Sequence, residues 1–278
     1  MTGPGPGAPA GADTVFFLSD YGRGDEFVGV VHAVLRRLAP GAAVIDLVHD
    51  LPPFDVRAAA RALTRALPHL GPGVVLAVVD PGVGGARRAV VVELAAGPGP
   101  RLLVGPDNGL LWPAAEAGGG PARAVELAPG DRPSTFDGRD VLAPAVAALC
   151  QGADPASLGR PADPASLVTL ADPVAEQGEA ADGRRWLRAE VTWVDRFGNA
   201  QLAAAGDLVP PTVGELAVAA PAGGPPRPLR RVGAFSDLAP GEAGVLVDAN
   251  GRLALVVREG SAAATLGVSA GTVVEAVW

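Results

Sequence analysis

The stretch VVLAVVDPGVGGARRAVVVEL, residues 74–94, sets the architecture of the first half of this chain. Its two apolar, β-branched runs, Val74–Val79 and Ala89–Leu94, have the length and composition of buried strands. The glycines and the proline between them are typical of a turn. Asp80 therefore stands at the end of a strand, beside a glycine loop and shortly before Arg87, which is where open α/β sheets bind ligands.

The same stretch also fits an ordinary hairpin with solvated charges, because Asp-Pro-Gly forms turns without any functional reason. The preceding segments favour a larger sheet. Apolar residues recur at helical spacing from Phe27 to Leu38, and Pro40-Gly41 ends that pattern. Together with further expected elements, the pattern gives a βαβαβ alternation, which predicts a largely parallel sheet with helices on its faces. The further elements are strands at Thr14–Leu18 and Val44–Val48 and a helix at Val56–Leu67.

The character of the chain changes after about residue 172. Before that point we expect a strand at Leu102–Val104, a polar loop at Ser134–Asp140 and an alanine-rich helix at Val141–Cys150. Beyond it, short apolar runs stand between turns, and no long amphipathic helix interrupts them. These expected strands are Trp186–Val194, Val213–Ala219, Gly244–Val247 and Leu253–Val257. The predicted organisation is a disordered tail at 1–13, a mainly parallel N-terminal α/β domain at 14–180, and a smaller C-terminal β-barrel-like domain at 186–278.

Composition limits the classes of function. The chain has 278 residues, 49% hydrophobic residues and a net charge of −8, so it has ample core and lacks the basic surface of a nucleic-acid-binding protein. Its one cysteine, Cys150, excludes an internal disulfide and a cysteine-rich metal site. No apolar run has membrane-spanning length, and the opening MTGPGPGAPAGAD lacks the features of a signal peptide. We therefore expect a cytoplasmic protein that binds neither nucleic acid nor membrane.

Several familiar motifs are missing. There is no Walker loop, no well-placed GxGxxG and no GxSxG elbow. The three histidines show no metal-ligand spacing: His32 and His69 suit helix surfaces, and His49 suits a structural hydrogen bond at a strand end. We accordingly predict no metal.

Acids and amides repeatedly follow strand ends in glycine-bearing turns. Such groups suit a small ligand with hydroxyl and ammonium groups, because carboxylates bind both through charge-assisted hydrogen bonds. Each of these Asp or Asn residues with a nearby glycine is also compatible with a simple turn that has no functional role. The residues concerned are Asp20 and Asp25, Asp80, Asp107 and Asn108, and Asp195, Phe197 and Asn199.

Six segments carry a further signal: SDYGRGDEF (19–27), VVDPGVGGARR (78–88), GPDNG (105–109), STFDGRDVLAPA (134–145), VDRFGN (194–199) and EGSAA (259–263). Together they resemble the S-adenosyl-L-methionine (SAM) hydrolase family, also called the SAM hydroxide adenosyltransferases, which are related to fluorinase and chlorinase. The likeness follows the family's order from about residue 14 to the C-terminus.

The resemblance implies hydrolysis of SAM to adenosine and L-methionine, with no cofactor besides the substrate. It also implies a homotrimer in which substrate lies between the N-terminal domain of one subunit and the C-terminal domain of its neighbour. Asp20 would hold the ribose hydroxyls, Asp25 the methionine ammonium, and Phe54 would form a wall beside the ribose. The neighbouring subunit would add further substrate-binding residues, and Asn108 of the PDNG segment is a further candidate. The residues from the neighbour would be Asp195, Phe197, Asn199, Glu259 and Ser261.

The family's water-handling group is an Asp, an Arg and a His. Asp80 and Arg87 match the first two, but Asp137 of TFDGRD stands where the family has histidine in TFHGRD. A carboxylate there can accept a proton or pair with Arg87. Four interpretations stay open at this point. The chain could be a hydrolase that uses Asp80, Arg87 and Asp137, a non-catalytic protein that binds SAM or adenosine, a halide-dependent SAM lyase, or an α/β scaffold whose turn acids have no function.

Overall fold

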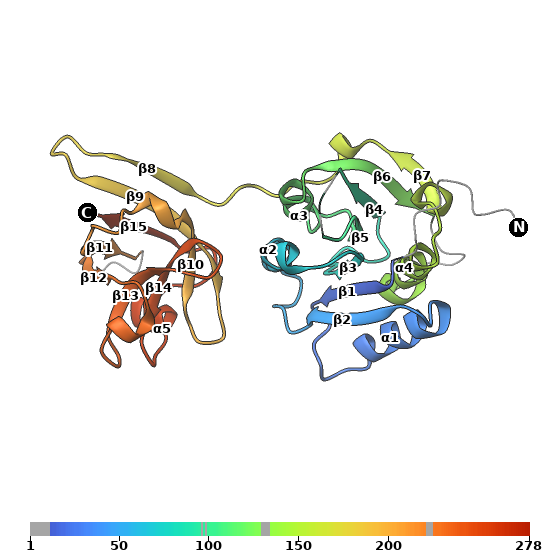
Figure 1. Cartoon of the computed structure of the whole chain (residues 1–278), viewed down its shortest axis with the longest axis horizontal. Helices are drawn as coiled ribbons and strands as arrows, with labels where there is room; N and C mark the ends of the chain where they lie inside the picture. The colour runs from blue at the N-terminus through green and yellow to red at the C-terminus, as the bar shows by residue number, and fades with distance from the viewer. Residues whose placement is uncertain (1–11, 96, 98, 129–133, 221–224) are drawn as a thin grey trace, which may run out of the picture. The chain divides into compact units, whose positions relative to one another are not determined.

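The computed structural model describes residues 12–95, 97, 99–128, 134–220 and 225–278 (Figure 1). It divides into two compact units, with the boundary between Leu170 and Ala171. This boundary precedes the expected domain end at residue 180, because residues 175–179 form a strand that pairs within the second unit. Of the expected tail at 1–13, residues 1–11 lie outside the described residues. Ala12 packs against the core of the first unit, so the tail prediction does not hold for it.

The first unit contains a seven-stranded sheet in the order β2-β1-β3-β5-β4-β6-β7. The neighbouring pairs from β2 to β5 are parallel, and the other three pairs are antiparallel. Five of the seven strands therefore share one direction, and the mainly parallel α/β prediction is confirmed. Because β5 lies between β3 and β4, the hairpin interpretation of residues 74–94 is wrong. The strands are β1 (Thr14–Ser19), β2 (Ala43–Val48), β3 (Val74–Val78), β4 (Ala89–Leu94), β5 (Leu102–Pro106), β6 (Pro121–Leu127) and β7 (Gly159–Ala162).

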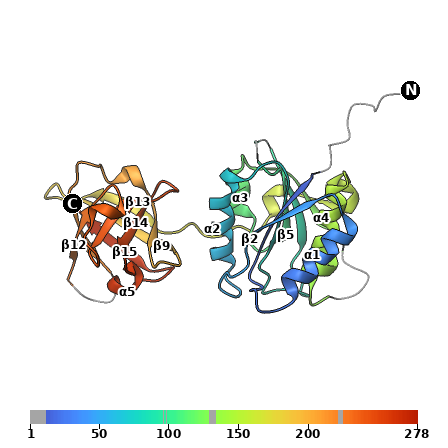
Figure 2. The same cartoon turned by 60° about the horizontal axis from the view of Figure 1, so that its bottom comes forward.

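Helices cover both faces of this sheet. Figure 2 shows α2 and α3 on one side of the strands and α1 and α4 on the other. The strands present continuous apolar runs to both layers, as expected for a sheet that is buried on two faces. The helices are α1 (Phe27–Leu38), α2 (Val56–Ala66), α3 (Trp112–Ala117) and α4 (Ala143–Cys150). Short 3-10 turns lie at Leu67–His69, Pro155–Leu158 and Pro164–Ser166.

The strand register brings three strand ends to the same edge of the sheet. Ser19 at the end of β1 lies level with Val78 at the end of β3, and β5 continues the same parallel arrangement. The turns that follow these strands carry Asp20, Asp80 and Asn108. The sheet therefore places the acidic and amide turns of the first unit side by side.

The second unit is a closed barrel of seven strands. Strand β10 pairs with both β14 and β9, which closes the barrel, and β8 adds to β9 outside it. Leu187, Leu216 and Leu253 are buried in its interior. The predicted barrel-like C-terminal domain is thus confirmed. Its elements are β8 (Ala175–Glu179), β9 (Arg185–Val194), β10 (Ala200–Ala205), β11 (Glu215–Ala219), β12 (Arg227–Arg231), β13 (Ala243–Val247), β14 (Arg252–Val257), β15 (Val273–Val277), α5 (Ala262–Leu266) and 3-10 turns at Gly206–Leu208 and Phe235–Asp237.

Within the described part of the chain, every helix is too short or too polar to span a bilayer.

Candidate active site

Asp80, Arg87 and Asp137, the three residues expected to handle water, lie in direct contact. Arg87 Nε donates a hydrogen bond of 2.9 Å to Asp80 Oδ1, and Arg87 Nη2 donates to the second Asp80 oxygen and to Asp137 Oδ2. Their side chains are 7–14% exposed. One guanidinium therefore joins two carboxylates that are 57 residues apart in the sequence.

The local backbone explains how this cluster forms. Asp80 follows the end of β3, and the turn after it lets Arg87 fold back, so that the Arg87 side chain passes close to Gly82. Gly84 adopts a φ of +74°, which favours glycine. Asp137 stands directly before a π-helical turn, Gly138–Leu142, that runs into α4. The expected polar loop therefore becomes helical at residue 138, three residues earlier than predicted, and π-helical turns are frequent at functional sites.

Electrostatics keep Arg87 charged. Burial alone would lower the pKa of Arg87, but the hydrogen bonds that Arg87 donates to Asp80 and Asp137 outweigh it and raise that pKa. With both carboxylates ionised, the cluster carries a net charge of −1. Within the described part of the chain, Arg87 donates to these carboxylates through Nε and Nη2, and Nη1 makes no hydrogen bond.

Tyr21 borders this cluster and was missed by the sequence analysis. Its ring packs edge-on against Phe136 at 5.5 Å and near Phe27 at 5.6 Å between ring centroids. Burial, reinforced by the negative charges of Asp20 and Asp80, raises the pKa of the Tyr21 phenol far above its ordinary value. The hydroxyl is therefore neutral and able to donate. The sequence offered one indication of its importance: Tyr21 is the only tyrosine, and it lies inside the SDYGRGDEF segment.

Gly138 is the residue that makes room for this tyrosine. A Cβ at position 138 would overlap the Tyr21 hydroxyl. The close approach brings the start of the π-helical turn, and with it Asp137, against the end of β1.

Asp20 and Phe54 are joined directly. Asp20 Oδ2 accepts a hydrogen bond of 2.8 Å from the backbone N–H of Phe54. Phe54 has a φ of +67°, unusual for a non-glycine residue, and is 71% exposed. Asp25 is exposed just before α1, and no described contact joins it to the other candidates. The structure thus brings Asp20 and Phe54 together and leaves Asp25 apart.

Asn108 uses both ends of its amide on the chain's own backbone. Its Nδ2 donates to the carbonyl of Val79 at 2.9 Å, and its Oδ1 accepts from the N–H of Leu110 at 3.2 Å. These bonds fix the strand end that carries Asp80. Contact between Asn108 and substrate stays a prediction.

The second arginine of the pair, Arg88, has a different role from Arg87. Its Nε donates to Asp107 at 2.8 Å, and its Nη2 donates to the Ser166 carbonyl at 2.7 Å. Asp107 also accepts from the N–H of Val168 at 2.8 Å. Arg88 therefore ties the PDNG turn to the last segment of the first unit, a function that the sequence analysis missed.

In the second unit, the predicted residues form a tight turn. Asp195 Oδ1 accepts hydrogen bonds of 2.9 Å from the N–H groups of Phe197 and Asn199, and Asp195 Oδ2 accepts from Asn199 Nδ2 at 2.8 Å. The Phe197 side chain is 75% exposed at the tip. The Asp195 carboxylate therefore shapes the turn that presents an aromatic ring.

This turn packs against the start of α5. Ser261 Oγ caps that helix by accepting from the Ala264 N–H at 3.1 Å, and the Ala263 N–H donates to the Gly198 carbonyl at 2.9 Å. Gly198 has a φ of +84°, and a Cβ there would overlap Ser261. Glu259, exposed and with a φ of +56°, lies just before the cap. The five predicted residues of this unit thus belong to one continuous local structure.

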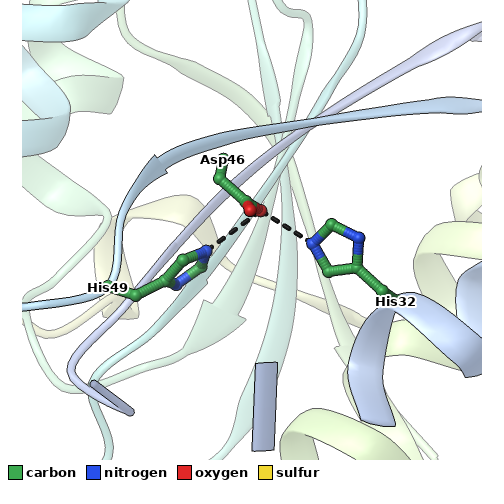
Figure 3. Close-up of side chains that lie close together, drawn as sticks. All are labelled: His32, Asp46 and His49. Atoms are coloured by element: carbon green, nitrogen blue, oxygen red, sulfur yellow. Dashed lines mark hydrogen bonds and ion pairs between the residues drawn. The ribbon is translucent and has the colours of Figure 1, made fainter. Parts of the chain in front are cut away.

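Two histidines lie close together although their spacing indicated no common site. His32 Nε2 and His49 Nε2 lie 2.7 Å and 3.0 Å from the same oxygen of Asp46 (Figure 3). The expected structural hydrogen bond of His49 is present, to Ser19 Oγ at 2.7 Å. The spacing of the histidines along the chain gave no sign of this contact, because it is α1 and β2 that bring His32 and His49 to one carboxylate.

Comparison with known proteins extends over nearly the whole chain. The SAM hydroxide adenosyltransferase N-terminal domain matches residues 15–159, and the corresponding C-terminal domain matches residues 189–275. A protein of Salinispora tropica named (R)-S-adenosyl-L-methionine hydrolase is 48% identical, over 92% of this chain and 95% of its own length. A Thermus thermophilus protein of the same name is 42% identical, over 92% and 96%.

A solved structure shows the same architecture. The crystal structure of an uncharacterized conserved protein from Thermotoga maritima superposes with a TM-score of 0.82 at 34% identity, covering 94% of this chain and 99% of the other. The chain belongs to the SAM hydroxide adenosyltransferase family.

Proposed function

We propose that this SAM hydroxide adenosyltransferase family member is a hydrolase that converts S-adenosyl-L-methionine into adenosine and L-methionine. Relatives named for this hydrolysis match it at 42–48% identity over 92% of the chain. The observation that carries the proposal is the contact of Arg87 with Asp80 and Asp137 at the strand ends of the first unit. Such a cluster can hold one water molecule and accept its proton.

The main catalytic task in this reaction is to activate and orient the attacking water. Water attacks the ribose C5′, the C5′–S bond breaks, and its electron pair returns to the sulfonium sulfur. The sulfur leaves as the neutral thioether of methionine, so no general acid is needed. The attacking water loses one proton. A site that holds water in line with the C–S bond supplies proximity and orientation, and a nearby base supplies the proton acceptor.

The cluster divides these tasks among its members. The N–H groups on Arg87 Nη1 orient the water, and Asp80 accepts its proton. Because two carboxylates more than balance the guanidinium, Arg87 does little to favour a free hydroxide, and proton transfer accompanies the attack. The net negative charge also attracts the sulfonium cation. No cofactor or metal takes part in this scheme.

Asp137, which stands where the family has histidine, accepts a hydrogen bond from Arg87 Nη2. Its carboxylate holds the Nη2 side of the guanidinium, which would leave Nη1 for the attacking water. We therefore interpret the substitution as a rearranged site that remains active. A protein that binds SAM without turnover is the competing interpretation.

The other predicted residues form two groups that together would enclose the substrate. Asp20 and Phe54 would border the ribose, and Asp25 would bind the methionine ammonium. Exposed aromatic rings on both units, Phe54 at 71% and Phe197 at 75%, support burial on assembly. We propose a homotrimer in which the second unit of a neighbouring subunit completes the site, with the turn of Asp195 and Asn199 and the segment of Glu259 and Ser261. A substrate found in the cytoplasm and a lone cysteine thiol fit a cytoplasmic location.

Incubation with SAM in oxygen-18 water tests the proposal. Mass spectrometry should find the label in the 5′-hydroxyl of adenosine, with one methionine released for each adenosine. Binding by calorimetry without any adenosine over hours would instead establish the non-catalytic protein. A 5′-halo-adenosine that forms only when chloride or fluoride is added would establish the halide-dependent lyase.

A further inference from the structure

We propose that His32, Asp46 and His49 form a binding site for a divalent transition-metal ion of the zinc type. Each residue offers one ligand atom, and these atoms all lie within 4.8 Å of one another. Figure 3 shows the two imidazole rings directed at the same Asp46 carboxylate from opposite sides. Two imidazoles and one carboxylate are ligands that zinc accepts, with a further position left for water.

The fold holds the three ligands close to metal-binding geometry. His32 lies on α1, Asp46 on β2, and His49 directly after β2. Two ligand atoms at about 2.0–2.1 Å from a tetrahedral zinc are roughly 3.4 Å apart. The measured separations from Asp46 Oδ1 are 2.7 Å to His32 Nε2 and 3.0 Å to His49 Nε2. Ligation therefore requires each imidazole nitrogen to move away from Asp46 Oδ1 by less than an ångström.

The second observation is an unsatisfied nitrogen. His49 is fully buried, and its Nε2 makes no hydrogen bond of acceptable geometry although Asp46 is near. A buried polar atom without a partner is costly and calls for an explanation. A metal ion at this point would satisfy it.

The opposite side of the His49 ring is already arranged for ligation. Its Nδ1 lies 2.7 Å from Ser19 Oγ, and Ser19 is itself fully buried. Metal-binding histidines commonly donate their other ring N–H to such a partner, which fixes the tautomer and the ring orientation. With Nδ1 donating to Ser19, the lone pair of Nε2 is directed at Asp46.

Charge and access also fit a cation. The Asp46 carboxylate lies between the two imidazoles and offers an oxygen ligand to a cation. The side chains of His32 and Asp46 are 35% and 27% exposed, which gives an ion a path from solvent. A bound ion would join α1 to β2 and, through Ser19, to the strand end that precedes Asp20. It would thus brace the substrate site from outside, without entering the reaction.

The test is a metal titration of the full chain, without a histidine tag and after treatment with a chelator. Calorimetry with zinc should show one saturable site, and zinc should raise the melting temperature. Cobalt in place of zinc should give the visible absorption of a low-coordinate nitrogen and oxygen site. His32→Ala should weaken binding at least tenfold, because even an outer partner such as Ser19 is worth about 10–100-fold in affinity.

The chain provides matched controls. His69→Ala removes the third histidine, which lies outside the cluster, and should bind zinc like the parent protein. Cys150→Ser should also bind normally, because burial raises the pKa of this thiol to about 11. His32 lies on a partly exposed helix face, so His32→Ala is expected to fold, and circular dichroism checks this. Absence of saturable zinc binding, unchanged affinity in His32→Ala, or loss of binding in His69→Ala would each overturn the proposal.

Discussion

Asp80 and Asp195 both follow a strand, yet their carboxylates bind different kinds of group. Asp80 binds a charged side chain, Arg87, which also contacts Asp137. Asp195 binds two backbone N–H groups and the amide of Asn199, all within its own turn. The first arrangement gathers charge from distant parts of the chain, whereas the second fixes the shape of a short loop.

This difference separates two contributions to one proposed site. A cluster of ionised side chains can exchange a proton with water. A carboxylate whose oxygens accept bonds from its own turn instead holds that turn in a shape that exposes neighbouring side chains such as Phe197. We expect the first unit to determine the rate of the chemical step and the second unit to determine substrate affinity. Substitutions in the two units should therefore have different effects.

Asp80→Asn should have the largest effect on activity. The amide keeps the shape of the side chain but cannot accept a proton, so kcat should fall by about 10²–10⁴-fold. Asp195→Asn, the matched change in the second unit, should mainly raise KM, because it disturbs the turn of Phe197. Initial rates of adenosine release, measured by chromatography, separate the two. An Asp80→Asn enzyme with kcat within tenfold of the parent value would contradict the assignment.

Gly198→Ala should have the largest effect on stability. The residue has a φ of +84°, and the added Cβ would overlap Ser261, so strain and crowding together should cost about 3 kcal/mol or more. Ser261→Ala should not rescue the variant, because the Cβ and Cα of Ser261 are themselves too close. Urea unfolding measures both. Full rescue would show that the hydroxyl alone makes the contact.

Gly138→Ala, unlike Gly198→Ala, should lose stability that a second substitution can restore. The new Cβ meets the Tyr21 hydroxyl, and the cost should be about 1–3 kcal/mol. Tyr21→Phe removes the overlapping oxygen, so the double variant should recover most of this loss in a double-mutant cycle. Additive losses would mean that Tyr21 and Gly138 are not in contact. The pair tests whether crowding in the first unit comes from one side-chain atom.

Ser261→Ala should have the smallest effect. It removes the cap of α5, which is worth about 1 kcal/mol. The comparable change in the first unit, Asp55→Ala, removes the carboxylate that caps α2 by accepting from the Ala58 N–H at 2.9 Å. Chemical denaturation should show a similar loss in the free energy of unfolding for the two variants. A loss of several kcal/mol for Ser261→Ala would show that the serine also holds the Gly198 turn.

The sequence predicted the strands that are continuously apolar and the turns between them. The runs that became β1, β3 and β4 are rich in β-branched and aromatic residues, and their two-sided burial gives a strong local signal. The strands β7, with sequence GRPA, and β8, with AEQGE, gave no such signal, because they are short and largely exposed. Their pairing depends on neighbouring strands and not on their own composition.

In the candidate site, too, the sequence predicted contacts between residues of recognisable motifs and missed contacts that depend on packing. The contact of Asp137 with Arg87 was one of two possibilities that motif order suggested, and the structure shows it. The shared carboxylate of His32 and His49 was missed, because it depends on the orientation of α1 over β2. The link from Arg88 to Ser166 was missed too, since it joins segments 78 residues apart. Contacts of this kind follow from packing, which local patterns do not report.

Closure of the barrel by β10 has a consequence for behaviour at high concentration. Strand borders with unpaired N–H and C=O groups recruit other chains into aggregates, and a ring of strands has no such border. The added strand β8 does have one, and it carries the exposed acids Glu176 and Glu179. Negative charges along that border would repel a second copy of the same strand. We therefore expect acidic pH, which neutralises these side chains, to promote precipitation before the barrel itself unfolds.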